Sequence, residues 1–360
     1  MECLAKSRSY SELLKYVDIL EDTSAIIVGE NFAIDGFAEK PVRVISHAHY
    51  DHIVGLKDSI YYSKQIVATP ATHDLIIILG YIGGRELRML YKNKMVRLNY
   101  YEEYIYGKEK LVLVPSHHII GSAQVLIETN DLRIGYTGDF KLGENTKIMD
   151  GLDILIIEST YGDPSYRRPF KNEVEDLLVD IVLDGLEIYG KVVIFGYHGK
   201  IQEAMQILRR NGVREPFLMP KRIYEVTRIA EKYGYEIGEY YNMRSLEGRE
   251  ILKSNRYILF EHFNKARHRR LGNNTLYIVL SGWEFDEPIK KLDRYTWLVA
   301  LSDHADFDEL IEYVEKAEPR LVIVDGSRQG NAEALARELN KRGWRSIVLP
   351  GPRVLSSSII

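Results

Sequence analysis

Residues 47–52, with the sequence H-A-H-Y-D-H, constrain this chain more than any other part of it. They bring together three imidazoles and a carboxylate, which are common protein ligands of zinc and related divalent ions. The apolar run before them predicts a short buried strand that would hold the loop rigid. Since alternate residues of an extended chain point the same way, His47 and His49 can bind one ion while Asp51 and His52 reach a second. A single histidine at a strand end is usually structural, but a cluster this dense predicts a metal site.

Two later segments supply ligands of the same kind where predicted strands end. Residues 115–118, P-S-H-H, follow an apolar run and offer a third imidazole for the first ion, although either histidine could be a surface side chain. Asp139 also follows an apolar run, and its two oxygens could each face one ion, but an aspartate after a glycine is also typical of a turn. The candidate ligands are therefore His47, His49, His118 and Asp139 for one ion, and Asp51, His52 and Asp139 for the other.

The order of the predicted strands and helices indicates a two-domain α/β protein. At 360 residues the chain exceeds one ordinary hydrophobic core. Short apolar strands dominate from about residue 24 to residue 128, and up to that point helices are expected only over 11–20 and 72–79. The character of the chain changes near residue 168. From residue 171 onward strand-like and helix-like runs alternate, for example 192–195 and 201–210, as in parallel sheets built from βαβ units.

Composition excludes several classes of protein. The chain has 45% hydrophobic and 28% charged residues and no run near the roughly 18 apolar residues that span a bilayer, so we expect a soluble protein without a membrane partner. The N-terminus lacks the pattern of a signal peptide, which predicts a cytoplasmic location. Cys3 is the only cysteine. A metal site must therefore use histidine, aspartate and glutamate, because an internal disulfide and a cysteine-ligated zinc finger are both excluded.

The candidate ligands resemble, in their order along the chain, the motifs of the metallo-β-lactamase fold. Asp35 within I-D-G, residues 47–52, His118 and Asp139 match the first four motifs of that fold. The resemblance implies a four-layer αββα core with two divalent ions at one edge. It also implies that Asp35 supports the histidine loop through hydrogen bonds rather than contacting an ion.

Later motifs narrow the resemblance to the β-CASP nucleases, the branch that contains the cleavage-and-polyadenylation endonuclease, bacterial ribonuclease J and the Artemis-type nucleases. Glu158 in I-E-S-T-Y-G matches the acidic motif of this branch, and His304 in S-D-H-A-D matches its later histidine motif. Residues 199–203, G-K-I-Q-E, resemble the G-R-x-Q-E signature of the inserted domain, with Lys200 in place of arginine. With S-G-W at 281–283 added, the chain is most similar to ligase-associated DNA exonucleases and archaeal mRNA 3′-end processing factors.

The resemblance covers nearly the whole chain and implies a discontinuous core. Residues 1–168 and 302–360 would form the metallo-β-lactamase domain, and residues 169–301 an inserted α/β β-CASP domain that restricts access to a single strand. No appended RNA-binding or dimerisation module is apparent. Targeting is therefore expected from a groove between the domains or from partners such as a DNA ligase, a helicase or RNA-processing proteins.

One position departs from the pattern of the RNA-cleaving members. In those proteins a further histidine follows the next strand and completes the second metal site, whereas this chain has Asp325 there, and the Artemis group has an apolar residue. Asp325 could ligate the ion, bind a ligand through water, or form an Asp-Gly turn. We therefore expect the second ion to be weaker or exchangeable.

The implied activity is hydrolysis of phosphodiester bonds in single-stranded DNA or RNA by a metal-bridging hydroxide. Two divalent ions, zinc first and manganese or iron as alternatives, held roughly 3.5–4 Å apart would activate a water and stabilise charge on the phosphate. His304, Glu158 and the ligand Asp51 are the expected catalytic residues. His304 would donate a proton to the leaving sugar oxygen while Glu158 orients it, although the capping pair that follows also suits a helix start. The resemblance favours an exonuclease in DNA repair or RNA processing.

Two other functions remain open from the sequence. A small-molecule hydrolase of the glyoxalase or lactamase type would use the same metal ligands, but it would not need residues 169–301, Glu158 or His304. A catalytically inactive nucleic-acid-binding subunit is disfavoured because the ligand set is intact.

Charge is distributed unevenly along the chain. The net charge of −4 gives no overall attraction to phosphates. Residues 165–301, however, contain 23 basic and 19 acidic residues, a balance of +4 that leaves −8 for the remainder. Lys200 at a strand-to-helix turn is the best candidate to bind a phosphate, because a helix N-terminus favours anions. Ser281, Gly282 and Arg267, the last from a basic run, are further candidates to bind the strand, although a basic cluster is more often a solvated face.

Overall fold

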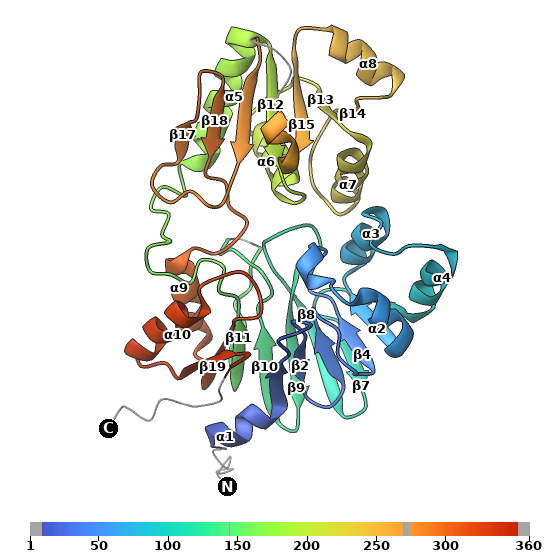
Figure 1. The fold of residues 1–360 in the computed structure, drawn as a ribbon, viewed down its shortest axis with the longest axis vertical. Helices are drawn as coiled ribbons and strands as arrows, with labels where there is room; N and C mark the ends of the chain where they lie inside the picture. Colours follow the sequence, from blue (N-terminus) through green and yellow to red (C-terminus); the bar gives the residue numbers. More distant parts are fainter. Residues whose placement is uncertain (1–8, 144, 269–273, 352–360) are drawn as a thin grey trace. The chain divides into compact units, whose positions relative to one another are not determined.

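The computed structural model describes residues 9–143, 145–268 and 274–351 (Figure 1). The chain divides into two compact units. Unit 1 takes Met1–Ile76, Ile82–Tyr166 and Ala305–Ile360, and unit 2 takes Ile77–Tyr81 and Arg167–His304. Among the described residues, no helix is both long enough and apolar enough to cross a membrane.

Unit 1 is built on two mixed sheets. The first has six strands in the order β1-β2-β3-β4-β5-β6, antiparallel from β1 to β3 and parallel from β3 to β6. The second has seven strands in the order β20-β19-β11-β10-β9-β8-β7. The strands of the first sheet are β1 Val17–Ile19, β2 Ile26–Val28, β3 Phe32–Ile34, β4 Val42–Val44, β5 Gln65–Ala68 and β6 Met95–Arg97. Those of the second are β7 Glu103–Tyr106, β8 Glu109–Pro115, β9 Ala123–Thr129, β10 Leu132–Tyr136, β11 Ile154–Ile157, β19 Leu321–Asp325 and β20 Ser346–Leu349.

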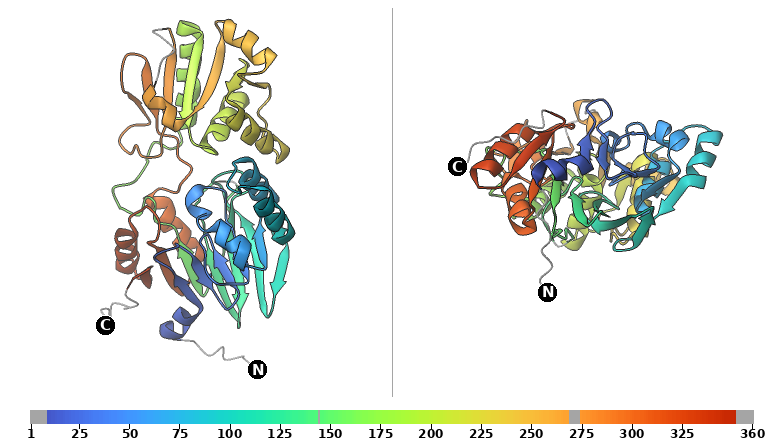
Figure 2. Two further views of the ribbon diagram at one scale, coloured as in Figure 1. Left: turned by 45° about the vertical axis from the view of Figure 1, so that its right-hand side comes forward. Right: turned by 90° about the horizontal axis from the view of Figure 1, so that it is seen from below.

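The two sheets of unit 1 pack face to face, with helices on their outer sides (Figures 1 and 2). One core cluster joins side chains of both sheets, for example Val44 of β4 with Ile134 of β10. A second cluster joins the opposite face of the seven-stranded sheet to α9 (Phe307–Ala317) and α10 (Ala332–Lys341). Helices α2 (Leu56–Tyr62), α3 (Pro70–Ile78) and α4 (Arg85–Lys94) are the neighbours of the six-stranded sheet. These layers confirm the predicted four-layer αββα arrangement.

Unit 2 contains one seven-stranded sheet in the order β14-β13-β15-β12-β16-β18-β17, parallel except for β17. This confirms the alternation of strands and helices predicted beyond residue 171. The strands are β12 Lys191–Gly196, β13 Phe217–Met219, β14 Tyr240–Asn242, β15 Tyr257–His262, β16 Leu276–Leu280, β17 Ile289–Lys291 and β18 Thr296–Val299. The helices are α5 Val174–Tyr189, α6 Lys200–Arg210, α7 Lys221–Lys232, α8 Leu246–Lys253 and the 3₁₀ segment η3 Phe263–His268.

The helix predictions for unit 1 were partly wrong. The segment 11–20 starts as a helix, α1 (Tyr10–Leu13) with the 3₁₀ turn η1 (Leu14–Tyr16), but it then becomes the strand β1. Val17 and Ile19 pair with β2 and bury their side chains, so sheet formation overrides the local preference. The helices α2 and α4 were missed, because their single apolar stripes are short and interrupted by polar residues.

Candidate metal centre

In the second sheet of unit 1, four strands from distant parts of the sequence have their carboxyl ends on the same side of the sheet. Strands β10, β11 and β19 are parallel neighbours, and β8 and β10 each pair antiparallel with β9, so β8, β10, β11 and β19 run in one direction. His118, Asp139, Glu158 and Asp325 lie at or just beyond the carboxyl ends of these four strands. The loop that follows β4 of the other sheet carries residues 47–52.

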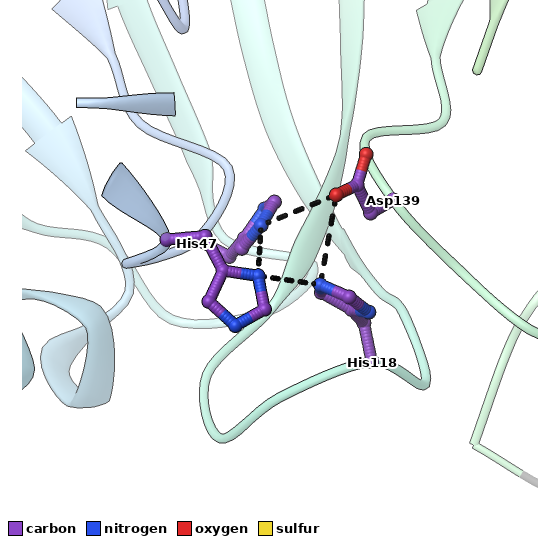
Figure 3. A group of neighbouring side chains, drawn as sticks. His47, His118 and Asp139 are labelled. Atoms are coloured by element: carbon purple, nitrogen blue, oxygen red, sulfur yellow. Dashed lines mark hydrogen bonds and ion pairs between the residues drawn. The ribbon is translucent and has the colours of Figure 1, made fainter. Parts of the chain in front are cut away.

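Four of the predicted ligands converge on one point. The Nδ1 atom of His49 lies 3.2 Å from Nε2 of His47 and 2.9 Å from Nε2 of His118. One carboxylate oxygen of Asp139 lies 3.5 Å from His47 Nε2 and 3.6 Å from His118 Nε2. One ligand atom from each of the four residues lies within 4.8 Å of the others. Figure 3 shows His47, His118 and Asp139 pointing toward one another from separate segments of the fold.

A second group of ligand atoms shares Asp139 with the first. The same Asp139 oxygen lies 3.2 Å from Nε2 of His52, and a carboxylate oxygen of Asp51 lies 3.4 Å from that nitrogen. His52 is fully buried, whereas the Asp51 side chain is 61% exposed. The second group is therefore open to solvent on the Asp51 side, and Asp139 is the carboxylate common to both groups.

The environment of the histidines shifts their pKa values in opposite directions. Burial lowers the pKa of His47 well below its usual value, and the neighbouring His52 and His118 lower it further. For His52, burial also acts to lower the pKa, but the carboxylates of Asp139, Asp51 and Asp35 outweigh it, and the pKa is raised well above the usual value. The lowered pKa keeps His47 neutral at neutral pH, so one of its ring nitrogens has a lone pair that could bind a metal ion. His52 lies among negatively charged carboxylates.

These residues fit divalent metal ions. Ring nitrogens and carboxylate oxygens face one another at the cluster, with Nδ1 of His49 between Nε2 of His47 and Nε2 of His118. The buried Nε2 of His52 makes no hydrogen bond within the described chain, although two carboxylates face it. A cation at each group would lie among these nitrogen and oxygen atoms, and imidazole with carboxylate is a donor set that zinc, manganese and iron accept.

The Asp35 carboxylate holds the histidine loop in place through hydrogen bonds. Its carboxylate accepts hydrogen bonds from the backbone N–H of Ser46 at 2.8 Å and from the Ser46 hydroxyl, and it lies 2.8 Å from Nδ1 of His52. Asp35 holds its backbone at a φ of 47°, which Asp tolerates better than most residues. The following Gly36 is required, because a Cβ atom there would lie 2.3 Å from the backbone of Ala25. Asp35 thereby fixes the ring of His52 with its Nε2 toward the ligand cluster.

The strand before the loop carries a residue whose role the sequence did not indicate. Arg43 lies inside the run that was predicted to be an apolar strand, and it is buried. Its guanidinium donates to the carbonyl of His52 at 3.0 Å, to the carbonyl of Val54 at 3.3 Å and to the hydroxyl of Ser59 at 3.2 Å. Burial lowers the pKa of Arg43 to about 10, so it is charged at neutral pH. It ties the far end of the histidine loop to α2.

The Asp139 turn is fixed by Glu158. Gly138 takes a φ of 56° between β10 and Asp139, which turns the chain so that the carboxylate reaches the histidines. Glu158 is buried and accepts a hydrogen bond from the backbone N–H of Phe140 at 2.7 Å. A carboxylate oxygen of Glu158 also lies within 4.8 Å of one from Asp139. Glu158 therefore anchors the residue next to Asp139, whose carboxylate is common to both groups.

Asp325 forms an ion pair with Arg328, which the sequence did not indicate. One of its oxygens accepts a hydrogen bond from Arg328 at 2.6 Å, and the other accepts from the backbone and hydroxyl of Ser327. The same guanidinium donates to the carbonyls of Ser24 at 3.2 Å and Asp35 at 2.5 Å. Burial acts to lower the pKa of Arg328, yet nearby Tyr136, Asp325 and Asp35 raise it above the usual value. The structure does not place Asp325 in any of the ligand groups of the described chain.

The remaining predicted site residues lie in unit 2. Lys200 is buried at the start of α6, and its ammonium lies 3.0 Å from a carboxylate oxygen of Asp303. The Ser281 hydroxyl accepts a hydrogen bond from the backbone N–H of Trp283, and Gly282 between them is buried. Arg267 is exposed on η3. His304, the last residue of unit 2, receives hydrogen bonds on its carbonyl from the Ser302 hydroxyl and from Arg168. Its successor Ala305 belongs to unit 1 and donates to the carbonyl of Phe140, the neighbour of Asp139.

No protein-family model matches this chain. Several known proteins are similar to it in sequence. An uncharacterised protein in the lig 3′ region of Acidianus ambivalens is 52% identical over 128 residues, which are 35% of this chain and 90% of that protein. An RNase J-like protein of Methanocaldococcus jannaschii is 30% identical over 240 residues, 62% of this chain and 55% of that protein. A probable DNA ligase of Opitutus terrae is 27% identical over 315 residues, 83% of this chain and 28% of the ligase.

The match thus extends over most of the Acidianus protein, but over only about half of the RNase J-like protein and less than a third of the ligase. Among solved structures, a protein of unknown function from Enterococcus faecalis superposes with a TM-score of 0.58 at 17% identity, over 86% of this chain and 79% of that one. At this identity the superposition supports the fold alone.

Proposed function

This chain belongs to the β-CASP branch of the metallo-β-lactamase family, and we propose that it is a metal-dependent nuclease that hydrolyses phosphodiester bonds in single-stranded nucleic acid. One observation carries the proposal: His47, His49 and His118 meet Asp139, which also reaches the group of Asp51 and His52. A shared carboxylate between two sets of nitrogen and oxygen ligands is the arrangement that two-metal hydrolases need. The name of the RNase J-like relative supports the same class of reaction.

Each side chain has a distinct task in the proposed reaction. Divalent ions bound at the two groups would lower the pKa of a water and stabilise negative charge on the attacked phosphate. Asp139 holds the two groups at a fixed separation, and Glu158 keeps Asp139 in place through the backbone of Phe140. We assign His304 as the proton donor to the leaving sugar oxygen, since imidazole titrates near neutral pH.

We propose zinc as the metal of the first group, which His47, His49, His118 and Asp139 would hold, because imidazole nitrogens and carboxylate oxygens are common zinc ligands. Unit 1 would be the metallo-β-lactamase core, and unit 2 the inserted β-CASP domain. We propose that the protein acts in the cytoplasm as an exonuclease in DNA repair or RNA processing. The similarity to part of a probable DNA ligase supports a DNA ligase as partner, and the RNase J-like relative supports RNA as substrate.

An assay on labelled strands tests the proposed function. Single-stranded DNA and RNA of one sequence, labelled at the 5′ or the 3′ end, would be incubated with the purified protein, whose metal content is measured by mass spectrometry. We expect zinc in the protein, cleavage of at least one strand, and loss of cleavage after chelation with recovery on adding metal. The position of the label in the first products gives the polarity. A well-folded protein that binds no zinc, manganese or iron and cleaves neither strand would contradict the proposal.

Substitution of His304 with alanine separates proton donation from metal binding. We expect strand cleavage to fall by about 10²- to 10⁴-fold, the usual contribution of a positioned general acid. We expect the metal content to be kept, because the two groups assigned to the ions, His47, His49, His118 and Asp139 for one and Asp51, His52 and Asp139 for the other, do not include His304. The hydrogen bonds that its backbone makes with Ser302 and Arg168 survive the substitution, so the local chain path should be kept. Unchanged cleavage in His304→Ala would refute the acid role, and loss of metal would assign His304 to the centre itself.

A further inference from the structure

The carboxyl edge of the unit 2 sheet carries exposed aromatic rings that the proposed reaction does not use. Strands β15, β12 and β16 are parallel neighbours, so the residues that follow them emerge at the same edge. Tyr197 follows β12, Phe263 follows β15, and Trp283 lies three residues beyond β16. Tyr197 is 45% exposed and Trp283 is 47% exposed. In parallel α/β sheets, this edge is where ligands usually bind.

Phe263 and Tyr197 form a stack that starts at the core of unit 2. Phe263 packs against the buried cluster that includes Val193, Leu259 and Tyr277. The ring of Tyr197 lies nearly parallel to that of Phe263, with their centroids 5.0 Å apart and an angle of 18° between the planes. One face of Tyr197 is thus backed by a ring that is itself anchored, while nearly half of the side chain is open to solvent. A planar ligand could extend this stack with little loss of side-chain freedom.

His262 packs against the Tyr197 ring. The two rings are perpendicular, with their centroids 5.3 Å apart and an angle of 88° between the planes. Burial lowers the pKa of His262, and the positive charge of Arg222 lowers it further, so the imidazole is neutral at neutral pH. The three rings of Tyr197, His262 and Phe263, which we call the aromatic platform, are therefore held together by packing that does not depend on a charge of the imidazole.

Basic side chains border the aromatic platform. The 3₁₀ segment η3, which begins with Phe263, packs against β12 and β15 and presents exposed Lys265 and Arg267. Arg222 is also exposed and acts electrostatically on His262. Lys200, by contrast, is neutralised by its buried ion pair with Asp303. An open ring with cations beside it is the combination by which proteins hold unpaired strands, because bases stack and phosphates attract the cations.

We propose that the aromatic platform binds one unpaired base of a single-stranded nucleic acid on the exposed part of the Tyr197 ring, with Lys265 and Arg267 beside its phosphates. The inference rests on the proposed nuclease function and names the part of unit 2 that holds the strand. Stacking uses the π-face that every base has, so the platform would bind without strong sequence preference. An ordinary apolar protein contact is disfavoured, because one backed ring among cations offers little apolar area for a partner to cover.

The affinity of Tyr197 variants for nucleic-acid strands tests whether the aromatic platform binds a base, and this measurement does not depend on cleavage. Fluorescent 12-nucleotide DNA and RNA strands with phosphorothioate linkages would be titrated with the wild-type protein, Tyr197→Ala and Tyr197→Phe, and their affinities read by anisotropy. We expect Tyr197→Ala to weaken binding about 5- to 100-fold, the range for loss of one stacked base, and Tyr197→Phe to stay within about twofold. The DNA and RNA arms show whether the platform distinguishes the two sugars.

Strands that contain abasic positions separate stacking from simple charge attraction. Removing the bases should weaken binding to the wild-type protein but not to Tyr197→Ala, since that variant has no ring left to stack. Tyr61→Ala, which removes a 54% exposed tyrosine of unit 1, should bind both strands as the wild type does. Equal affinities of Tyr197→Ala and the wild type for the intact strand would overturn the platform, as would an equal loss on abasic strands in both proteins. If the wild type binds strands through the platform but never cleaves them, only the nuclease function fails.

Discussion

Replacing Asp139 with asparagine should remove at least one metal ion per chain and lower strand cleavage by about 10³-fold or more. The carboxylate lies 3.2–3.6 Å from His52, His47 and His118, so it is common to both ligand groups. Asparagine keeps the shape but has a neutral amide that cannot supply negative charge to two cations. Metal ions contribute several kcal/mol of transition-state stabilisation, and each 1.36 kcal/mol corresponds to a tenfold change in rate. Metal content by mass spectrometry and cleavage of a labelled strand would be measured together.

Asp131→Asn is the matched control for this substitution. Asp131 is an exposed aspartate of the same unit, in the turn between β9 and β10 with a φ of 64°, which asparagine also adopts readily. We expect its metal content and cleavage rate to equal those of the wild type. If Asp139→Asn also kept its full metal content and its rate, Asp139 would be a structural turn residue and the shared-ligand assignment would be wrong.

Replacing Asp325 with asparagine should lower the free energy of unfolding by about 3–5 kcal/mol, as expected when a buried ion pair loses one partner. The Asp325 side chain is 3% exposed and that of Arg328 is 10% exposed, so the guanidinium would be left charged in the protein interior. Arg328 also reaches the carbonyls of Ser24 and Asp35. The loss should therefore appear in the unfolding transition of unit 1, followed by circular dichroism in denaturant.

Two further variants test whether the loss of stability comes from the unpaired buried charge. One also replaces Arg328, and the other breaks an ion pair that is partly exposed. Asp325→Asn combined with Arg328→Met removes both charges of this pair, so it should recover a large part of the lost stability. Asp153→Asn, which breaks a pair with Arg320 at a partly exposed position, should cost at most about 1 kcal/mol. If Asp325→Asn instead removed an ion and left stability unchanged, Asp325 would be a metal ligand. Asp325→His alone should not tighten the second ion, because it would leave Arg328 without its carboxylate.

Much of the fold followed from local patterns. The apolar run before residue 47 predicted the buried strand β4, and the alternation of strands and helices beyond residue 171 predicted the parallel sheet of unit 2. The prediction failed where a contact outside the segment decided the structure. Val17 and Ile19 have a helical neighbour in sequence, but they gain more by pairing with β2.

The sequence alone predicted which side chains could bind metal at the candidate centre, because ligand type is a property of each residue and the spacing in 47–52 is local. It also predicted His118 and Asp139 as partners, since each follows an apolar strand. Only the tertiary structure decided what Asp325 contacts. Its partner Arg328 is close in sequence, but the same guanidinium binds carbonyls about 300 residues away, at Ser24 and Asp35. Where a buried charge finds its acceptors depends on which strands pack together, and that is set by the whole core rather than by any one motif.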